Sequence, residues 1–206
     1  MNPGLVTLAV GLLVLAVAFV RLTAVLSTRE IAAVATLGAL SAAGRVVFAP
    51  LPSVQPSTVL VIVTGWVLGP AAGFTAGATT AFVSNVFLGQ GPWTVWQMLA
   101  WGLTGALAGV LGKRRHAHPT AVIVAYSAVA GLAFSGLMDV WFWLSFVYPL
   151  TVRSLLLAMA MGLPFDLLHA VGNVIFALLF AEKTVLLLER FKSRMRVEYR
   201  EVDGVV

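Results

Sequence analysis

The chain has 206 residues, of which 60% are hydrophobic and 10% are charged, and its formal net charge is +5. A soluble domain usually carries about 25% charged residues, so this composition excludes a water-soluble globular protein and leaves no room for a separate soluble domain. The positive charge lies in connections between apolar segments, so it indicates topology in a lipid bilayer and not nucleic-acid binding.

Seven apolar segments follow one another along the chain, and each predicts a helix. The bilayer core contains no water, so the backbone N–H and C=O groups of each segment must form hydrogen bonds with one another, as they do in a helix. The alternating apolar and polar pattern of a barrel strand is absent. The fold class that we expect is therefore all-α and integral to the membrane. The expected spans are residues 4–24, 29–49, 57–69, 71–89, 95–112, 119–147 and 154–182. The third is short for a span of about 20 residues, so we expect it to be tilted or embedded between neighbours.

The first segment could be mistaken for a secretory signal. A signal peptide carries positive charge before its apolar core, whereas the first basic residue here, Arg21, follows the apolar run of residues 4–20. We expect instead an uncleaved first span whose N-terminus lies outside the cell.

Basic residues predict the orientation of the other spans, because those near span ends stay cytoplasmic. Eleven of the thirteen Lys and Arg residues fall on one side: Arg21, Arg29, Lys113, Arg114, Arg115, Lys183, Arg190, Lys192, Arg194, Arg196 and Arg200. We expect that side and the C-terminus inside a plasma membrane, which leaves Arg45 and Arg153 for the outer side. The basic C-terminal stretch could be a solvated end, a contact with anionic lipid or a docking segment.

Small residues recur at helical spacing in three spans, where they allow helices to approach closely in lipid. Gly73 and Gly77 share one face of the fourth span, and Gly105 and Gly109 share one face of the fifth. We expect both faces inside the bundle. The second span carries a third stripe, which could pack internally or meet another membrane protein: Ala35, Ala39 and Ala43.

Ionisable and amide side chains inside a bilayer are costly and usually indicate function. Asp166, His169 and Asn173 lie at i, i+3 and i+7, hence on one face of the last helix. They could form a structural network, with Asp166 or Asp139 paired to His169 or to an arginine, or they could contact a ligand. The sequence leaves both alternatives open.

Aromatic and polar residues gather near the connections expected outside. Trp and Tyr at this depth often form an interfacial belt, but amides and two arginines lie close to them in the topology. Together they favour an apolar pocket with a few orienting polar groups, suited to an uncharged or weakly anionic flat molecule. The expected pocket residues are Arg45, Gln90, Trp93, Trp96, Gln97, Asp139, Trp141, Tyr148 and Arg153, to which the deep residues Asp166, His169 and Asn173 are added.

Motifs for chemistry are absent from the sequence. It contains no cysteine, no G-x-x-x-x-G-K-[ST] phosphate loop, no H-E-x-x-H and no metal-spaced histidine cluster. Ser135 and His169 could in principle form a protease dyad of the rhomboid type. However, Ala133 stands where the G-x-S-G nucleophile motif of that family has glycine. We expect no enzyme activity, no metal and no cofactor.

Four sequence features together resemble the substrate-binding S components of energy-coupling factor (ECF) vitamin transporters, over residues 29–182. They are the Ala35–Ala39–Ala43 stripe, GWVLGPAAGFTAG at 65–77, SNVFLGQGPWTVWQM at 84–98 and GLPFDLLHAVGN at 162–173. The last two segments look most like those of the cobalamin-type S components. The resemblance implies a six-helix core at residues 29–183. An extra N-terminal span with a short cytoplasmic linker (1–28) precedes this core, and a basic cytoplasmic tail (184–206) follows it.

The resemblance also implies partners and a mechanism. Such a subunit captures a vitamin in an outward cavity and docks on a transmembrane coupling subunit driven by two cytoplasmic ATPases. In the family the alanine stripe faces the coupling subunit, and the bundle topples in the membrane to present its cavity inward. The expected ligand is cobalamin or a related corrinoid. Thiamin or its pyrimidine precursor, riboflavin, a queuosine precursor, or a proton-driven carrier using Asp139, Asp166 and His169 remain alternatives.

Overall fold

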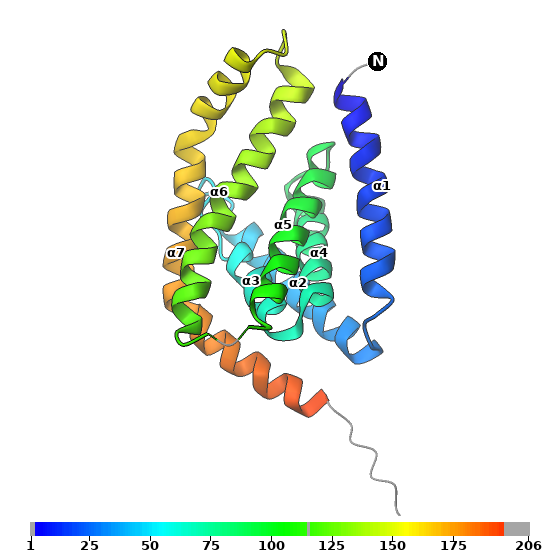
Figure 1. Ribbon diagram of the computed structural model, residues 1–206, viewed down its shortest axis with the longest axis vertical. Coiled ribbons are helices and arrows are strands. Elements are labelled where there is room, and N and C mark those ends of the chain that lie inside the picture. Colours follow the sequence, from blue (N-terminus) through cyan, green and yellow to red (C-terminus); the bar gives the residue numbers. More distant parts are fainter. Residues whose placement is uncertain (1–2, 115, 196–206) are drawn as a thin grey trace, which may run out of the picture.

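A computed structural model describes residues 3–114 and 116–195, and every regular element in this part of the chain is a helix. The helices are α1 (Pro3–Thr23), α2 (Thr28–Val47), α3 (Ser57–Leu68), α4 (Pro70–Leu88), α5 (Trp93–Leu111), α6 (Pro119–Phe146) and α7 (Val152–Met195). All except α3 are long and apolar enough to cross a membrane. The predicted all-α membrane fold, a six-helix bundle with one extra N-terminal helix, is confirmed (Figure 1). Arg115, Arg196 and Arg200, and the tail after residue 195, lie outside the described residues.

Helix ends follow local sequence signals. Helix α2 begins with a capping box, in which the Ser27 hydroxyl and the Glu30 carboxylate bind each other's backbone N–H groups. Helices α3 and α4 are separated only by Gly69, whose φ of 103° is a conformation that glycine adopts without strain. Gly89, with φ of 106°, ends α4 in the same way. These two turns fix where α3, α4 and α5 begin and end.

Helix α3 forms the centre of the bundle. Eleven of its twelve residues are buried, and it packs against α2, α4, α5, α6 and α7. The largest apolar core cluster includes Ile62, Val63 and Trp66 from this helix, together with Ile123 and Phe176. Burial on all sides explains how a helix of twelve residues remains inside a membrane protein, and the prediction of an embedded third helix is confirmed.

Helices α3, α4 and α5 pack so closely that the backbone of one helix contacts the backbone of the next. A Cβ atom added at Gly73 would overlap the carbonyl group of Gly105, and one added at Gly77 would overlap the carbonyl group of Trp101. The predicted internal packing of these glycine faces is therefore confirmed.

Two alanine substitutions should change stability in opposite directions. Gly105→Ala should destabilise the fold by roughly 1–3 kcal/mol, because its methyl group would meet the backbone of Gly73. Gly136→Ala should stabilise α6 by up to about 1 kcal/mol, because an added Cβ there meets no atom within 4 Å and alanine favours a helix over glycine. Thermal unfolding in one detergent measures both. Equal shifts for the two variants would contradict the close packing.

Helix α7 continues past its expected end at residue 182 to Met195. Its last part bends beneath the bundle (Figure 1), where Leu188 is buried and Lys192 Nζ donates a hydrogen bond of 2.5 Å to the carbonyl oxygen of Val67. The last carbonyls of a helix lack partners within it, so Lys192 stabilises the end of α3. The sequence prediction stopped early because this segment is too polar for a membrane span, although not for a helix.

The extra helix α1 lies against α4, α5 and α6. Gly11 allows a close approach, since an added Cβ would lie 3.2 Å from Val95 and 3.9 Å from the ring of Trp96. Leu15 joins Phe74 and Leu99 in an apolar cluster between these helices.

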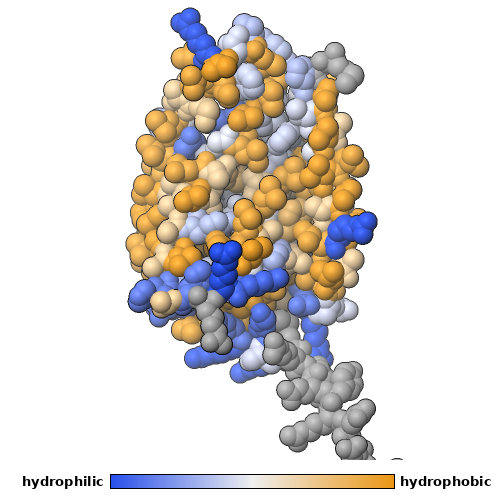
Figure 2. Space-filling view, in the orientation of Figure 1, coloured by the Kyte–Doolittle hydropathy of each residue, from blue (hydrophilic) through white to orange (hydrophobic). Residues whose placement is uncertain are grey.

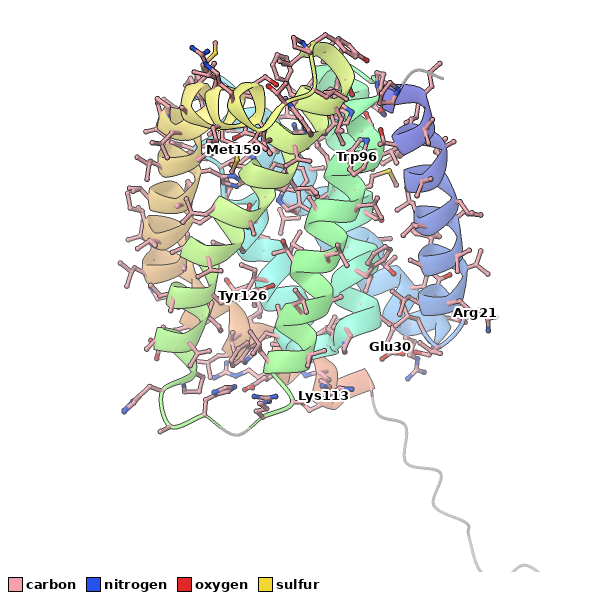
Figure 3. All side chains as sticks on the ribbon, turned by 45° about the horizontal axis from the view of Figure 1, so that its top comes forward. Arg21, Glu30, Trp96, Lys113, Tyr126 and Met159 are labelled. Atoms are coloured by element: carbon pink, nitrogen blue, oxygen red, sulfur yellow. The ribbon has the colours of Figure 1, made fainter. Side chains whose placement is uncertain are left out.

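The two ends of the bundle differ in chemistry. Apolar side chains form a belt around its middle, and hydrophilic residues gather at the lower end (Figure 2). We call that lower end the basic end; Arg21 and Lys113 lie there, while Trp96 lies towards the opposite end (Figure 3). The opposite, loop end carries the connections 48–56, 89–92 and 147–151.

Candidate solute-binding cavity

A cavity of about 480 Å³ lies at the loop end of the bundle. Residues of α2, α4, α5, α6 and α7 and of the 48–56 connection line it. The lining residues are Arg45, Ala49, Leu51, Ser53, Gln55, Leu88, Gln97, Trp101, Phe134, Ser135, Met138, Asp139, Gly162, Phe165, Asp166 and His169. This is a mixed surface, in which a guanidinium, two carboxyl groups and two amides interrupt apolar and aromatic walls.

Arg45 is held in place by neutral groups. Its Nη1 donates to Ser84 Oγ at 2.7 Å and to Asn85 Oδ1 at 2.5 Å. Its guanidinium carbon lies 5.0 Å from the centre of the Trp101 ring. Among residues 3–114 and 116–195 no carboxylate pairs with Arg45, whose two side-chain hydrogen bonds both come from Nη1. The side chain is thus fixed while retaining a positive charge and donors for a ligand.

The network around Arg45 extends to the 89–92 connection. Asn85 Nδ2 donates to Gln97 Oε1 at 2.8 Å and to Thr94 Oγ1 at 3.0 Å. Thr94 in turn donates to Gln90 Oε1, and Gln90 Nε2 donates to the carbonyl oxygen of Phe82. Gln90 therefore helps to position the cavity wall without lining the cavity.

A second buried network forms the floor. Trp101 Nε1 donates to Thr58 Oγ1 at 3.0 Å, and this hydroxyl lies 2.9 Å from His169 Nε2. His169 Nδ1 lies 3.3 Å from Ser135 Oγ. The ring of Phe134 packs against Trp101 at 4.5 Å and against His169 at 5.1 Å, between ring centroids. Both histidine nitrogens therefore contact hydroxyl groups, and neither an aspartate nor an arginine pairs with them in the described residues.

Two carboxyl groups, Asp139 on α6 and Asp166 on α7, face the same cavity. Gly162 leaves room for the first, since an added Cβ would lie 2.5 Å from Asp139 Oδ1. Asp139 Oδ2 is buried and has no hydrogen-bond donor among the residues described, and the Asp166 carboxyl group lies beside the Asp139 carboxyl group. An unpaired buried oxygen is costly, so this position favours a ligand that donates a hydrogen bond.

The structure brings together five of the expected pocket residues and separates the others. Arg45, Gln97, Asp139, Asp166 and His169 line the cavity. Asn173, although on the same helix face as His169, is fully buried in the contact of α7 with α6, where its Nδ2 donates to the Ser127 carbonyl. The others outside the lining are Gln90, Trp93, Trp96, Trp141, Tyr148 and Arg153.

The tryptophans of the loop end pack mainly with other helices. Trp93 and Trp141 meet edge to face at 6.4 Å between ring centroids. Trp96 approaches Gly11 of α1, and its buried Nε1 has no acceptor in the part of the chain described. Tyr148 and Arg153 are exposed. A position near the outer loops therefore did not suffice to bring these side chains into the cavity.

Sequence reasoning missed several lining residues. Trp101 lies in the middle of α5, away from the connections near which the pocket was expected, and Gln55 lies in the 48–56 connection, where no pocket residue was expected. The sequence indicated for Ser135 only a possible role in a protease dyad, not a place in the cavity wall. The signal that could have revealed Trp101 is its depth, because an indole N–H far inside a membrane helix requires a buried acceptor.

The alanine stripe of α2 faces away from the bundle. Ala35, Ala39 and Ala43 are all exposed, whereas Gly38 and Ala42 on the other side of the helix are buried. Helix α1 packs on α4, α5 and α6 and leaves these alanines uncovered. The stripe is therefore not part of the internal packing.

A helical membrane bundle with a polar-lined cavity is typical of membrane proteins that bind a solute. The family model of the S component of ECF-type riboflavin transporters matches residues 25–185, which begin after α1. The chain belongs to this family. It is a multi-pass membrane protein and a transporter subunit rather than an enzyme, and S components work with an ECF module of transmembrane and ATPase subunits and bind a vitamin. The match supports an S component but not the cobalamin type in particular. Comparison with curated proteins and with solved structures gave no match.

Proposed function

We propose that this chain captures riboflavin in the cavity at its loop end and delivers it through an ECF transporter. The observation that carries the proposal is a cavity of about 480 Å³ with an arginine, two carboxyl groups and an aromatic floor, in a chain of the riboflavin S-component family. The power for transport comes from partner subunits, for which we propose one transmembrane coupling subunit and two cytoplasmic ATPases.

The size of the cavity favours a flavin over a corrinoid. Pockets for drug-sized ligands usually measure about 300–1,000 Å³, and this cavity of about 480 Å³ lies in the lower half of that range. Riboflavin is a drug-sized molecule, whereas cobalamin is several times larger. The cobalamin alternative would require the loop end to open widely.

The polar groups of the cavity match those of riboflavin. The flat ring system of the vitamin can lie against Trp101 and Phe134, because aromatic rings favour stacked or edge contacts. Its ring carbonyl oxygens can accept hydrogen bonds from the guanidinium of Arg45. Its ribityl hydroxyls can donate to Asp139 and Asp166, which would satisfy the buried Oδ2 of Asp139.

The charge distribution supports an orientation with the loop end outside the cell. Arg21, Arg29 and Lys113 lie at the basic end, where the positive-inside rule expects the cytoplasm. We expect a single cysteine at Ser53 to react with an impermeant thiol reagent added outside intact cells, and a single cysteine at Lys113 to react only after permeabilisation. Labelling of both from the same side would contradict this orientation.

Fluorescence titration of the purified chain tests the ligand. Riboflavin should bind tightly and its emission should be quenched, because the flavin ring would lie beside Trp101. Cyanocobalamin and thiamin, followed by thermal shift, should produce no comparable stabilisation, since a specific ligand stabilises the folded state by mass action. Stabilisation by cobalamin and not by riboflavin would overturn the assignment.

A further inference from the structure

A second cavity, a groove of about 760 Å³, lies at the basic end between the start of α2 and the last turns of α7. Its walls are mostly apolar and include Leu37, Leu187 and Phe191, and Arg29 and Arg194 also line it. The groove is far from the proposed vitamin site, with which it shares no lining residue.

The groove exists because the end of α7 bends beneath the bundle and is held there. Lys192 is bound to the carbonyl of Val67, and Leu188 is buried against the core. The neighbouring Leu187 remains 65% exposed and Phe191 44% exposed. This segment therefore presents an apolar face that the rest of the described chain does not cover.

The two arginines have no acidic partner within residues 3–114 and 116–195. Glu30, the acidic residue next to Arg29 in the sequence, is occupied by Ser27, which donates to it from both its backbone N–H and its hydroxyl. Arg29 and Arg194 are both exposed, one on each of the two helices that form the groove. A pair of unpaired guanidinium groups beside an apolar surface fits an amphiphile whose polar group is an anion.

We propose that the groove binds an anionic phospholipid of the cytoplasmic leaflet. The headgroup phosphate lies between Arg29 and Arg194, and an acyl chain lies along Leu37, Leu187 and Phe191. Guanidinium groups bind phosphate oxygens through paired hydrogen bonds, and anionic lipids are concentrated at the cytoplasmic surface. The assignment rests on the orientation proposed above, and does not require that riboflavin is the vitamin.

Lipid competition on the purified full-length chain tests this site. Native mass spectrometry should show retention of dioleoyl phosphatidylglycerol in preference to dioleoyl phosphatidylcholine. The double variant Arg29→Gln/Arg194→Gln should bind phosphatidylglycerol at least about tenfold more weakly, with phosphatidylcholine unchanged, because only electrostatic attraction is removed. Riboflavin binding by the same sample shows that the variant is folded. If riboflavin does not bind to the wild type either, an unchanged melting temperature of the variant shows that it is folded.

A matched control removes the same charge elsewhere at the basic end. Arg21→Gln/Lys113→Gln replaces two exposed basic residues outside the groove and should retain the preference for phosphatidylglycerol. Equal losses in the two double variants would indicate general attraction and overturn the site. Displacement of the lipid by glycerol phosphate, which has no acyl chain, would also overturn it. So would unchanged lipid binding with failed assembly on the coupling subunit, which would assign the groove to that partner.

Discussion

The Ala39→Trp variant should bind riboflavin with the wild-type dissociation constant and yet support no uptake in cells. Ala39 is exposed in the middle of the stripe formed with Ala35 and Ala43, on the side of α2 opposite to the buried Gly38 and Ala42. In lipid, small residues allow two backbones to approach closely, and an indole there would hold the coupling subunit away. The cavity at the loop end would be unchanged. Uptake of labelled riboflavin and fluorescence titration of the purified variant measure the two properties separately.

The matched control is Ala133→Trp on α6, which adds the same side chain to another exposed alanine in the middle of a membrane helix. It should leave both uptake and binding intact. Loss of binding together with transport in Ala39→Trp would mean that the substitution disturbs the bundle itself. Normal uptake would remove the alanine stripe from the coupling interface.

The fold was largely predictable because a membrane span is determined by the hydrophobicity of about 20 consecutive residues, which the sequence shows directly. The apolar segments predicted the bounds of every helix within a few residues, except for the end of α7, and Gly69 and Gly89 end α3 and α4 where two of the predicted spans end. The end of α7 was predicted too early because residues 183–195 are too polar for a membrane span, although they continue the helix, and the contact of Lys192 with Val67 beneath the bundle is a tertiary contact that no local pattern records. The extra helix α1 was expected, but its place against α4 and α5 depends on the space left at Gly11.

The cavity was only partly predictable. Arg45, Asp139 and Asp166 were predicted to be pocket residues because burial of a charged group in a membrane costs free energy and usually indicates a function. All three line the cavity. The tryptophans were harder to assign, since an indole suits an interfacial belt, a helix contact or a ligand equally well. Trp101 and Thr58 meet across 43 positions of sequence, and that pairing is a property of the packed bundle.

The hydrogen-bond networks explain why so many polar residues surround one small cavity. Arg45 is anchored through Asn85 to Gln97 and, by way of Thr94, to the 89–92 connection. A charged group that is already positioned loses little freedom when a ligand binds, so more of its interaction contributes to affinity. The connection at Gln90 therefore supports the proposed vitamin site from outside it.

Arg45→Met should weaken riboflavin binding by roughly 10- to 100-fold, since a hydrogen bond to a charged group contributes about 1.5–3 kcal/mol and 1.4 kcal/mol is tenfold. Methionine retains much of the length of the side chain and removes its charge and donors. The variant should also lose some thermal stability, because the hydrogen bonds to Ser84 and Asn85 disappear. Fluorescence titration and a melting curve of the same preparation measure both effects.

Arg153→Met provides the matched control, because Arg153 is exposed at the same end of the bundle and its loss changes the net charge equally. It should bind riboflavin as the wild type does. Similar weakening in both variants would mean that Arg45 acts through long-range charge rather than contact. Arg45→Lys should recover part of the affinity, because an ammonium group restores the charge but cannot reproduce the fork of donors that a guanidinium presents. Wild-type affinity in Arg45→Met would remove the arginine from the vitamin site.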